Sequence, residues 1–326
     1  LPYDRSGPSL AVGSARLATL ARLQGPRHGP QIILTSANAV LQRTLTPFRI
    51  RALSLDIRVG SRIDRDALAA RLSNLGYVRV DNVADHGEYA VRGGIVDFFP
   101  AGETLGYRLD FFGDEVEDIR RFDPADQRSS AKADGFSLRP ASEVQLSEEN
   151  IRRFRTQYRE LFGVSATGDT LYQAISDGRR SAGMEHWLPL MEERLVPITD
   201  HLGDDCLWVE EDGAASARAH RWEAIADYHA NRLEAEGRTP GAYRPLPPDA
   251  LYILDDEWRT LADAVPVHGV TGFAEPPAPN IIDLDSHAAR DFADIRAQNG
   301  PIYAEIAAHI AAERRAGRKI ILACYS

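Results

Sequence analysis

One short stretch of the sequence, residues 87–100 (GEYAVRGGIVDFFP), combines charged and apolar side chains in a pattern suited to contacting a partner. It reads as two β-runs separated by a pair of glycines. Because side chains alternate along a strand, Glu88, Ala90 and Arg92 share one face of the first run, opposite Tyr89 and Val91. A strand pair with one polar, arginine-bearing face can pack its other face against a core and present the polar face to a partner. We interpret this stretch as part of a docking surface.

Two other groups of residues could carry chemistry. The first is a run of carboxylates comprising Asp110, Asp114, Glu115, Glu117 and Asp118. These residues follow a hairpin and its turn without the convergence that metal ligands need, so a solvated hairpin is the preferred interpretation. The second is His186 beside Trp187. No acidic or nucleophilic partner is indicated nearby, and a catalytic histidine needs an orienting group, so a packed loop histidine is favoured.

Motifs of common enzyme sites are absent from the sequence. There is no GxxxxGK[ST] phosphate loop, no complete GxGxxG fingerprint, and no HExxH, GxSxG or CxxC pattern. The two glycines at 93 and 94 lack both the third glycine and the following helix of a dinucleotide site. We therefore predict no catalytic residue, no bound cofactor and no metal site in this chain.

Composition places the chain among globular proteins. Its 326 residues suggest two or three domains, and 44% hydrophobic residues supply a sizeable core. The net charge of −10 disfavours a surface that grips nucleic acid throughout, although a local arginine patch remains compatible with it. Only two cysteines occur, and no apolar run approaches the length of a membrane span. These features predict a cytoplasmic protein without a membrane partner, and the start at Leu1 and the apolar final run suggest a piece of a longer chain.

A strand-rich unit is expected between Ser54 and Pro124, around the docking stretch. Asp64 is a good N-cap for a helix over residues 65–75, and Gly76 ends it. The alternating run 107–112, a Gly-Asp turn and the run 116–122 predict a β-hairpin. One helix and about six short strands make a small α+β unit.

The flanking segments have an α/β texture. Helices are predicted over residues 10–23 and 148–162, the latter capped by Ser147, and another begins after Ser36. Apolar runs at 31–35, 251–253, 281–284 and 319–325 are predicted to be strands, the first and last of them buried. The expected fold is therefore one α/β domain, formed by residues 1–53 and 126–326 and split by an inserted α+β domain at 54–125.

Several ordered blocks of the sequence carry a resemblance to a known family. They are LPYDR at 1–5, GYVRVD at 76–81, the stretch 87–100, YRLDFF at 107–112, FDP at 122–124 followed by QRS at 127–129, and GMEHWLPL at 183–190. The series resembles the amino-terminal region of the bacterial transcription-repair coupling factors (Mfd), which is itself similar to the excision-repair protein UvrB. The resemblance spans the whole chain and is densest from Ser54 to Ser129.

The resemblance implies a fold and a role. The split α/β domain would be a degenerate helicase-like, RecA-type domain, and the insert would recruit UvrA for nucleotide excision repair. The full-length family recognises RNA polymerase stalled at DNA damage and displaces it with an ATP- and Mg-dependent translocase that acts on double-stranded DNA. Those motor parts lie outside this chain, so the fragment is expected to be non-catalytic. In the family, an intramolecular contact masks the docking domain until activation.

The resemblance also assigns contact residues. Arginines that match Arg79 and Arg92 contact UvrA in UvrB, and Glu88 and Tyr89 flank that site. A further UvrB arginine corresponds to Ala90, so this contact is missing here. The alternative for the two arginines is an ordinary surface pairing with Asp81 or Glu88, worth less than about 1 kcal/mol. Two rival functions are a UvrB-like ATP-dependent damage-processing subunit and a DNA-binding module.

Overall fold

The chain has a mixed α/β structure with several sheets. A computed structural model describes all residues except 1, 5–6, 28, 101, 164–168, 204, 239–242, 274, 285–289 and 321–326. Two compact units are present, Leu1–Gly272 and Phe273–Ser326. Within the described residues, no helix is both long and apolar enough to cross a membrane. The α/β class is confirmed, while the helicase-like split stays a prediction.

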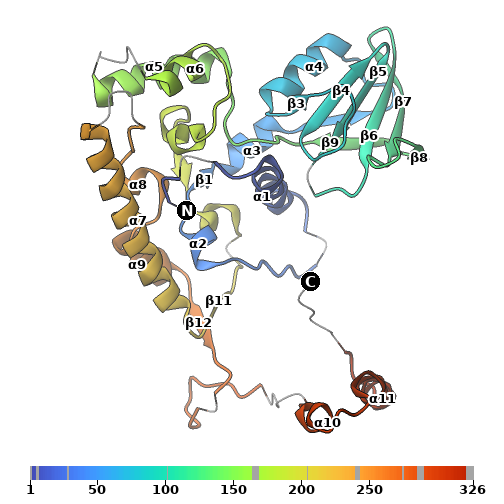
Figure 1. Ribbon diagram of the computed structural model, residues 1–326, viewed down its shortest axis with the longest axis vertical. Helices are drawn as coiled ribbons and strands as arrows, with labels where there is room; N and C mark the ends of the chain where they lie inside the picture. Colours follow the sequence, from blue (N-terminus) through green and yellow to red (C-terminus); the bar gives the residue numbers. More distant parts are fainter. Residues whose placement is uncertain are drawn as a thin grey trace. The chain divides into compact units, whose positions relative to one another are not determined.

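The first unit contains a six-stranded sheet whose strands lie in chain order (Figure 1). Its strands are β3 (Val78–Arg79), β4 (Glu88–Arg92), β5 (Ile95–Phe99), β6 (Gly106–Phe112), β7 (Glu115–Phe122) and β8 (Ser129–Lys132). β3 runs parallel to β4, and every later neighbour is antiparallel. The predicted hairpin is confirmed as β6 and β7, joined through Gly113, whose φ of 66° suits glycine in a tight turn.

One face of this sheet is covered by helix α4 (Arg65–Asn74) and by a strand pair, β2 (Leu55–Arg58) with β9 (Gly135–Leu138). The predicted cap is present, because an Asp64 carboxylate oxygen accepts the Ala67 N–H at 2.7 Å. Leu68 and Leu72 of α4 are buried, one turn apart on the same side of the helix. Phe136 of β9 packs against the sheet, with its ring centroid 5.0 Å from that of Phe98. We call the covered side the inner face.

The inner face shares its hydrophobic core with the flanking part of the first unit. The same cluster of buried side chains runs from Val96 and Leu109 in the sheet through Leu138 to Phe154 and Trp187. Tyr77 reinforces the junction by donating its hydroxyl to the carbonyl of Arg139 at 3.0 Å. The predicted domain limits at 54 and 125 stay predictions, and the β2–β9 pair links residues 55–58 with residues 135–138.

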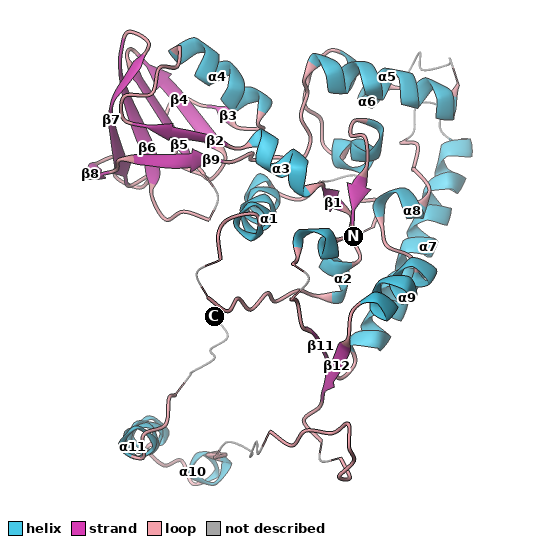
Figure 2. Ribbon diagram, turned by 180° about the vertical axis from the view of Figure 1, so that it is seen from behind, coloured by secondary structure: helices cyan, strands magenta, loops and turns pink. Residues whose placement is uncertain are grey.

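The flanking part is mostly helical (Figure 2). Its helices are α1 (Leu10–Leu23), α2 (Ala37–Val40), α3 (Pro47–Leu53), α5 (Glu148–Phe162), α6 (Thr170–Ser176), α7 (Ala214–Arg238), α8 (Pro248–Leu251) and α9 (Asp255–Ala264), with 3₁₀ turns at Met184–Leu190 and Ile198–His201. Its strands form two pairs, antiparallel β1 (Thr44–Leu45) with β10 (Leu195–Val196), and parallel β11 (Trp208–Glu211) with β12 (Val267–Val270). The β11–β12 pair with α7–α9 between them is a β-α-β connection, as an α/β domain requires.

Some predictions for the flanks are wrong. Residues 31–35 are extended without strand pairing, and Ile32 and Leu34 are 87% and 91% exposed. Leu251 ends α8 and Tyr252 makes only an isolated bridge, so residues 251–253 are not a strand. The predicted helix at Ser147 is confirmed, since Ser147 Oγ accepts the Asn150 N–H at 3.2 Å.

The second unit, taken by itself, contains helices α10 (Ala293–Ala297) and α11 (Ile302–Arg315). Its Phe292 ring lies 5.8 Å from the His309 ring, measured between centroids. The strand predicted at 281–284 is absent. Most of the strand predicted at 319–325 lies outside the described residues.

His186 lies in an aromatic cluster of the flanking part. Its ring centroid is 6.0 Å from that of Tyr3 and 5.5 Å from that of Tyr243. Burial, reinforced by the positive charge of Arg232, lowers the pKa of His186 from 6.5 to about 4. The imidazole is therefore neutral near pH 7, and the packed environment agrees with the interpretation of His186 as a loop histidine.

Protonation of His186 should destabilise the fold in acid. Its folded pKa lies below the unfolded value, so the unfolded state binds the extra proton first and stability falls as the pH drops from about 6.5 towards 4. We expect this residue to account for a loss of about 2 to 3 kcal/mol. Urea unfolding at both ends of this pH range should show a shallower loss for His186→Gln. His220→Gln, at an exposed position of α7, is the matched control and should follow the parent.

A candidate partner-docking face

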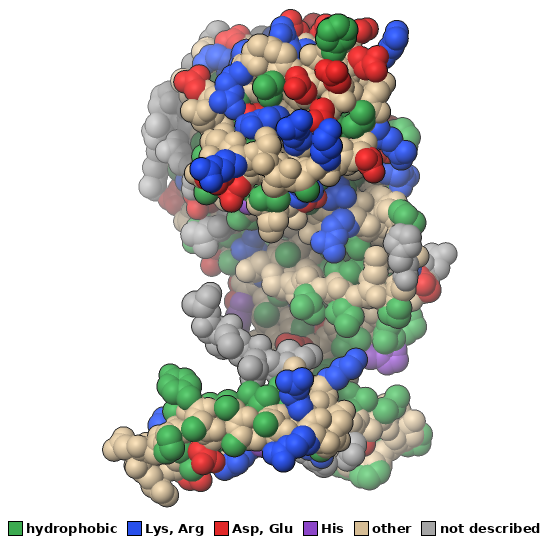
Figure 3. Space-filling view, turned by 90° about the vertical axis from the view of Figure 1, so that its right-hand side faces the viewer, with side chains coloured by type: hydrophobic (Ala, Val, Ile, Leu, Met, Phe, Trp, Pro, Cys, Tyr) green, Lys and Arg blue, Asp and Glu red, His purple; other side chains and the backbone are tan. Residues whose placement is uncertain are grey.

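The second face of the six-stranded sheet, which we call the outer face, carries the charged residues of the docking stretch. Residues directly opposite one another on neighbouring strands point to the same side of a sheet. The register aligns Ala90 with Asp97, Asp97 with Arg108, Arg108 with Arg120, and Arg120 with Lys132. A row of charges therefore crosses the outer face from β5 to β8. In Figure 3, positive and negative side chains mingle over the upper part of the molecule, which carries this sheet.

Asp97 is the buried member of this row, with 1% of its surface exposed. Arg92 Nη2 donates to Asp97 Oδ2 at 2.5 Å. Arg108 donates to both oxygens of the same carboxylate, from Nε to Oδ1 at 2.8 Å and from Nη2 to Oδ2 at 2.9 Å. We call these three residues the Asp97 triad. Because one carboxylate faces two guanidinium groups, the triad has a net positive charge.

The two arginines of the triad differ in exposure. The Arg108 side chain is 20% exposed, and its Nη1 also donates to Ser129 Oγ at 3.0 Å. Its hydrogen bonds to Asp97 raise the pKa of Arg108, so it stays charged. The Arg92 side chain is 45% exposed, and its Nη1 donates to Asn82 at 3.0 Å. Arg108 therefore fixes the carboxylate from within the sheet, and the carboxylate holds Arg92 at the surface.

A second group on the outer face also pairs one carboxylate with two cations, one of them on the same strand as the carboxylate. Asp118 Oδ2 accepts from Arg120 Nε at 2.6 Å, and Asp118 Oδ1 lies 3.3 Å from Lys132 Nζ. The hydrogen bond from Arg120 lowers the pKa of Asp118, with Lys132 adding to the effect. The Arg120 and Lys132 side chains are 49% and 75% exposed. We call this group the Asp118 triad.

The remainder of the outer face is closed by a small apolar cluster. Val83, Ala90, Phe99 and Phe122 are buried against one another. Gln127 holds the covering loop in place, because its Nε2 donates to the carbonyl of Val83 at 2.8 Å. Ala90 is 1% exposed beneath this cover. The position where UvrB has a further arginine is therefore core here.

The structure separates the four predicted contact residues. Arg92 is on the outer face and exposed, as described above. Arg79 is exposed on β3, without an ion pair or a side-chain hydrogen bond to any described residue. By register Arg79 lies beside Tyr89, which belongs to the inner face, so the two arginines reach the solvent from different sides of the sheet. A partner that contacts both must approach the β3–β4 edge.

Glu88 and Tyr89 have structural roles in the fold. One carboxylate oxygen of Glu88 accepts the backbone N–H groups of Ala84 and Asp85 at 2.8 and 2.9 Å, which orders the loop before β4. Tyr89 is 3% exposed, and its hydroxyl lies 2.7 Å from Ser73 Oγ on α4. A buried tyrosine does not reach a partner in this conformation, so we leave Tyr89 out of the docking face.

Sequence reasoning missed Asp97 and Arg108. The alternatives considered for Arg92 were Asp81 and Glu88, whereas the structure pairs Arg92 with Asp97 across the hairpin. A signal was present, because a tight turn at Gly93 and Gly94 aligns Arg92 with Ile95 and Ala90 with Asp97. Asp97 is then the diagonal neighbour of Arg92 on the same face.

The acidic hairpin residues do not form a metal site in this structure. Among the described residues, no group of three or more His, Cys, Asp or Glu side chains is placed to hold a metal ion. Asp118 is instead engaged by Arg120 and Lys132. Asp110 is exposed on the outer face, directly opposite Asp118.

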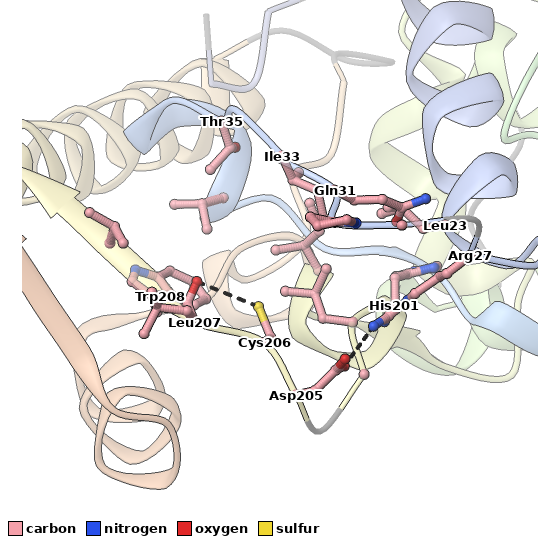
Figure 4. Close-up of a pocket in the computed structure, with 17 residues that line it drawn as sticks. Leu23, Arg27, Gln31, Ile33, Thr35, His201, Asp205, Cys206, Leu207 and Trp208 are labelled. Atoms are coloured by element: carbon pink, nitrogen blue, oxygen red, sulfur yellow. Dashed lines mark hydrogen bonds and ion pairs between the residues drawn. The ribbon is translucent and has the colours of Figure 1, made fainter.

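A cavity of about 700 Å³ lies in the flanking part, between residues 29–35 and the segment leading into β11 (Figure 4). At its wall, Arg27 Nη1 donates to Asp205 Oδ1 at 2.6 Å. His201 Nε2 lies 2.9 Å from Thr44 Oγ1, and its Nδ1 lies 3.1 Å from Gln24 Nε2. These contacts tie the histidine to β1 and to the end of α1. Among the described residues, no hydrogen bond joins His201 to Cys206, whose thiol donates to the carbonyl of Leu207 at 3.8 Å.

Comparison with known proteins matches this region and most of the chain. Residues 55–144 match the model of the UvrB interaction domain. The chain is 38% identical over 260 residues to the transcription-repair-coupling factor of Escherichia coli strain K12, covering 79% of this chain and 22% of the relative. It is 34% identical over 259 residues to that of Haemophilus influenzae, with coverage of 79% and 22%. For Myxococcus xanthus the values are 36% over 216 residues, 63% and 17%.

The predicted resemblance to the transcription-repair coupling factors is therefore confirmed. The matched family model includes every strand of the six-stranded sheet and the β2–β9 pair. The chain spans only about a fifth of the length of the E. coli and H. influenzae relatives.

Removal of the Asp97 charge should destabilise the fold. In Asp97→Asn, Arg92 and Arg108 lose the carboxylate between them, and breaking a buried ion pair typically costs 3 to 5 kcal/mol. Because both arginines retain some solvent, we expect a loss of about 2 to 3 kcal/mol, measured by urea unfolding. Asp110→Asn removes an exposed carboxylate from the same face and should change stability by less than about 0.5 kcal/mol. Equal stability of the two variants would contradict the structural role of Asp97.

Proposed function

We propose that this chain, as a relative of the transcription-repair coupling factors with a UvrB interaction domain, recruits UvrA through the sheet that carries the Asp97 triad. The observation that carries the proposal is the Arg92 guanidinium, which is half-exposed on the outer face and held by a buried carboxylate. An arginine fixed in this way loses little side-chain entropy on binding, and its planar fork suits a partner carboxylate.

The family match supports the partner assignment. The UvrB interaction domain model covers residues 55–144, which include Arg79, Arg92 and both triads. Interface energy is usually concentrated in a few arginine and aromatic anchors, so two exposed arginines at one edge of a sheet are sufficient for a docking site. Arg79 on β3 and Arg92 on β4 meet this condition at the β3–β4 edge.

The wider role is that of the longer relatives. We propose that the parent protein recognises RNA polymerase stalled at DNA lesions, displaces it with an ATP-dependent translocase, and brings UvrA to the site. In this division of labour the present chain acts as a non-catalytic recruiting module. The match covers 22% of the E. coli relative, so we place the motor in the rest of the parent protein.

Arg79 gives the cleanest test of docking. Its side chain makes no ion pair or hydrogen bond with the described part of the chain, so Arg79→Ala should leave the fold intact. We expect UvrA to bind this variant about 2 kcal/mol more weakly, roughly 30-fold in Kd. Calorimetric titration of purified UvrA into the 326-residue chain measures the difference.

A matched control is Arg152→Ala, which removes the same charge from an exposed position on α5, away from the sheet. Its affinity for UvrA should equal that of the parent chain. If the parent chain gives no UvrA binding at all, the proposed function is wrong. If Arg79→Ala binds like Arg152→Ala, the β3–β4 edge is not the docking site.

A further inference from the structure

The Asp118 triad, like the Asp97 triad, pairs one carboxylate with two cations, but it has no role in the docking described above. Arg92 and Arg108 come from the strands on either side of Asp97, whereas Asp118 is paired with Arg120 of its own strand and with Lys132 of the adjoining strand. The Asp97 and Asp118 side chains are 1% and 17% exposed, whereas Arg92 and Arg120 are 45% and 49% exposed. Each triad therefore presents an exposed cation and hides the anion that orients it.

The two triads adjoin on the same face, because Arg108 is directly opposite Arg120, while their exposed arginines Arg92 and Arg120 lie farther apart. Arg92 is on β4 and Arg120 is on β7, with two strands between them. Three inter-strand steps of about 4.8 Å, with an offset of two residues along the strands, separate them by roughly 16 Å. Lys132, on the adjoining strand β8, adds a second exposed cation to the Asp118 triad.

The cross-strand row that joins Arg92 to Asp118 limits the kind of partner that fits. Ile95 and Asp110 occupy the positions between Arg92 and Asp118 in one cross-strand row. Asp110 is exposed, so a continuous polyanion such as a nucleic-acid backbone that followed this row would be repelled at Asp110. A protein surface with separate carboxylate groups avoids this repulsion. The net charge of −10 on the whole chain further disfavours a polyanion.

We infer that the Asp118 triad is a second contact point of the docking face, which binds a second group of carboxylates on the same protein partner, about 16 Å from the group that Arg92 binds. The inference rests on the proposed function, because it takes that partner to be UvrA. Two separated charge contacts fix the orientation of the partner as well as its affinity.

The test compares UvrA binding by three forms of the whole chain. Arg120→Ala/Lys132→Ala should weaken binding at least tenfold and should flatten its salt dependence, because two cations leave the interface. Arg152→Ala/Arg153→Ala removes the same charge from exposed positions on α5 and should bind within about twofold of the parent. Urea unfolding of each variant checks that the fold is intact.

A third variant separates contact from folding. Asp118→Asn removes the carboxylate that orients Arg120 and Lys132 but keeps both cations, so binding should weaken by less than in the double variant. A loss as large as that of the double variant would mean that the triad only supports the fold, and would overturn the inference. Binding of Arg120→Ala/Lys132→Ala at the level of the α5 control would also overturn it.

The same titrations separate this inference from the proposed function. Absence of UvrA binding by the parent chain defeats both. Binding that weakens with Arg92→Ala but not with Arg120→Ala/Lys132→Ala defeats only the second contact point. A parallel titration with a short DNA duplex should show no binding by the parent. DNA affinity that disappears with Arg120→Ala/Lys132→Ala would assign the triad to nucleic acid instead.

Discussion

The candidate docking face depends on the Asp97 carboxylate, which is buried on the outer face of the sheet. Burying a carboxylate is costly unless its oxygens are fully paired, and here Arg92 and Arg108 supply three hydrogen bonds to it. Arg108 is itself anchored to Ser129 and lies over the Phe122 ring, 5.0 Å from its centroid. Arg92 is the outermost member of this network, so the position of its guanidinium is set by the interior of the sheet.

This arrangement connects folding with partner recruitment. The inner face joins the common core through residues such as Phe98 and Leu109, which makes the sheet a rigid support. The outer face carries paired charges whose carboxylates are withdrawn and whose cations are exposed. An overall acidic chain can thereby offer a locally basic surface to an acidic partner. The same pairing explains why Arg92 is both a structural residue and a proposed contact, whereas Arg79 has only the second role.

Local signals in the sequence predicted much of the fold and part of the site. The caps at Asp64 and Ser147 and the hairpin turn at Gly113 each depend on a few neighbouring residues, and all three are present. Ile32 and Leu34 were predicted to be buried in a strand, but burial needs a neighbouring strand that residues 31–35 do not have in this structure. Arg92 and Arg108 both pair with Asp97. Predicting this required the cross-strand register, which composition and alternation alone do not provide.

A double-mutant cycle on Arg92 and Asp97 tests this account most directly, with UvrA affinity as the readout. If Asp97 acts on the partner by holding Arg92, Asp97→Asn should weaken UvrA binding in the parent chain and have little further effect in Arg92→Ala. The coupling free energy should then be about 1 kcal/mol or more. Additive losses, or unchanged UvrA affinity in a folded Asp97→Asn variant, would contradict the claim that this buried carboxylate organises the docking face.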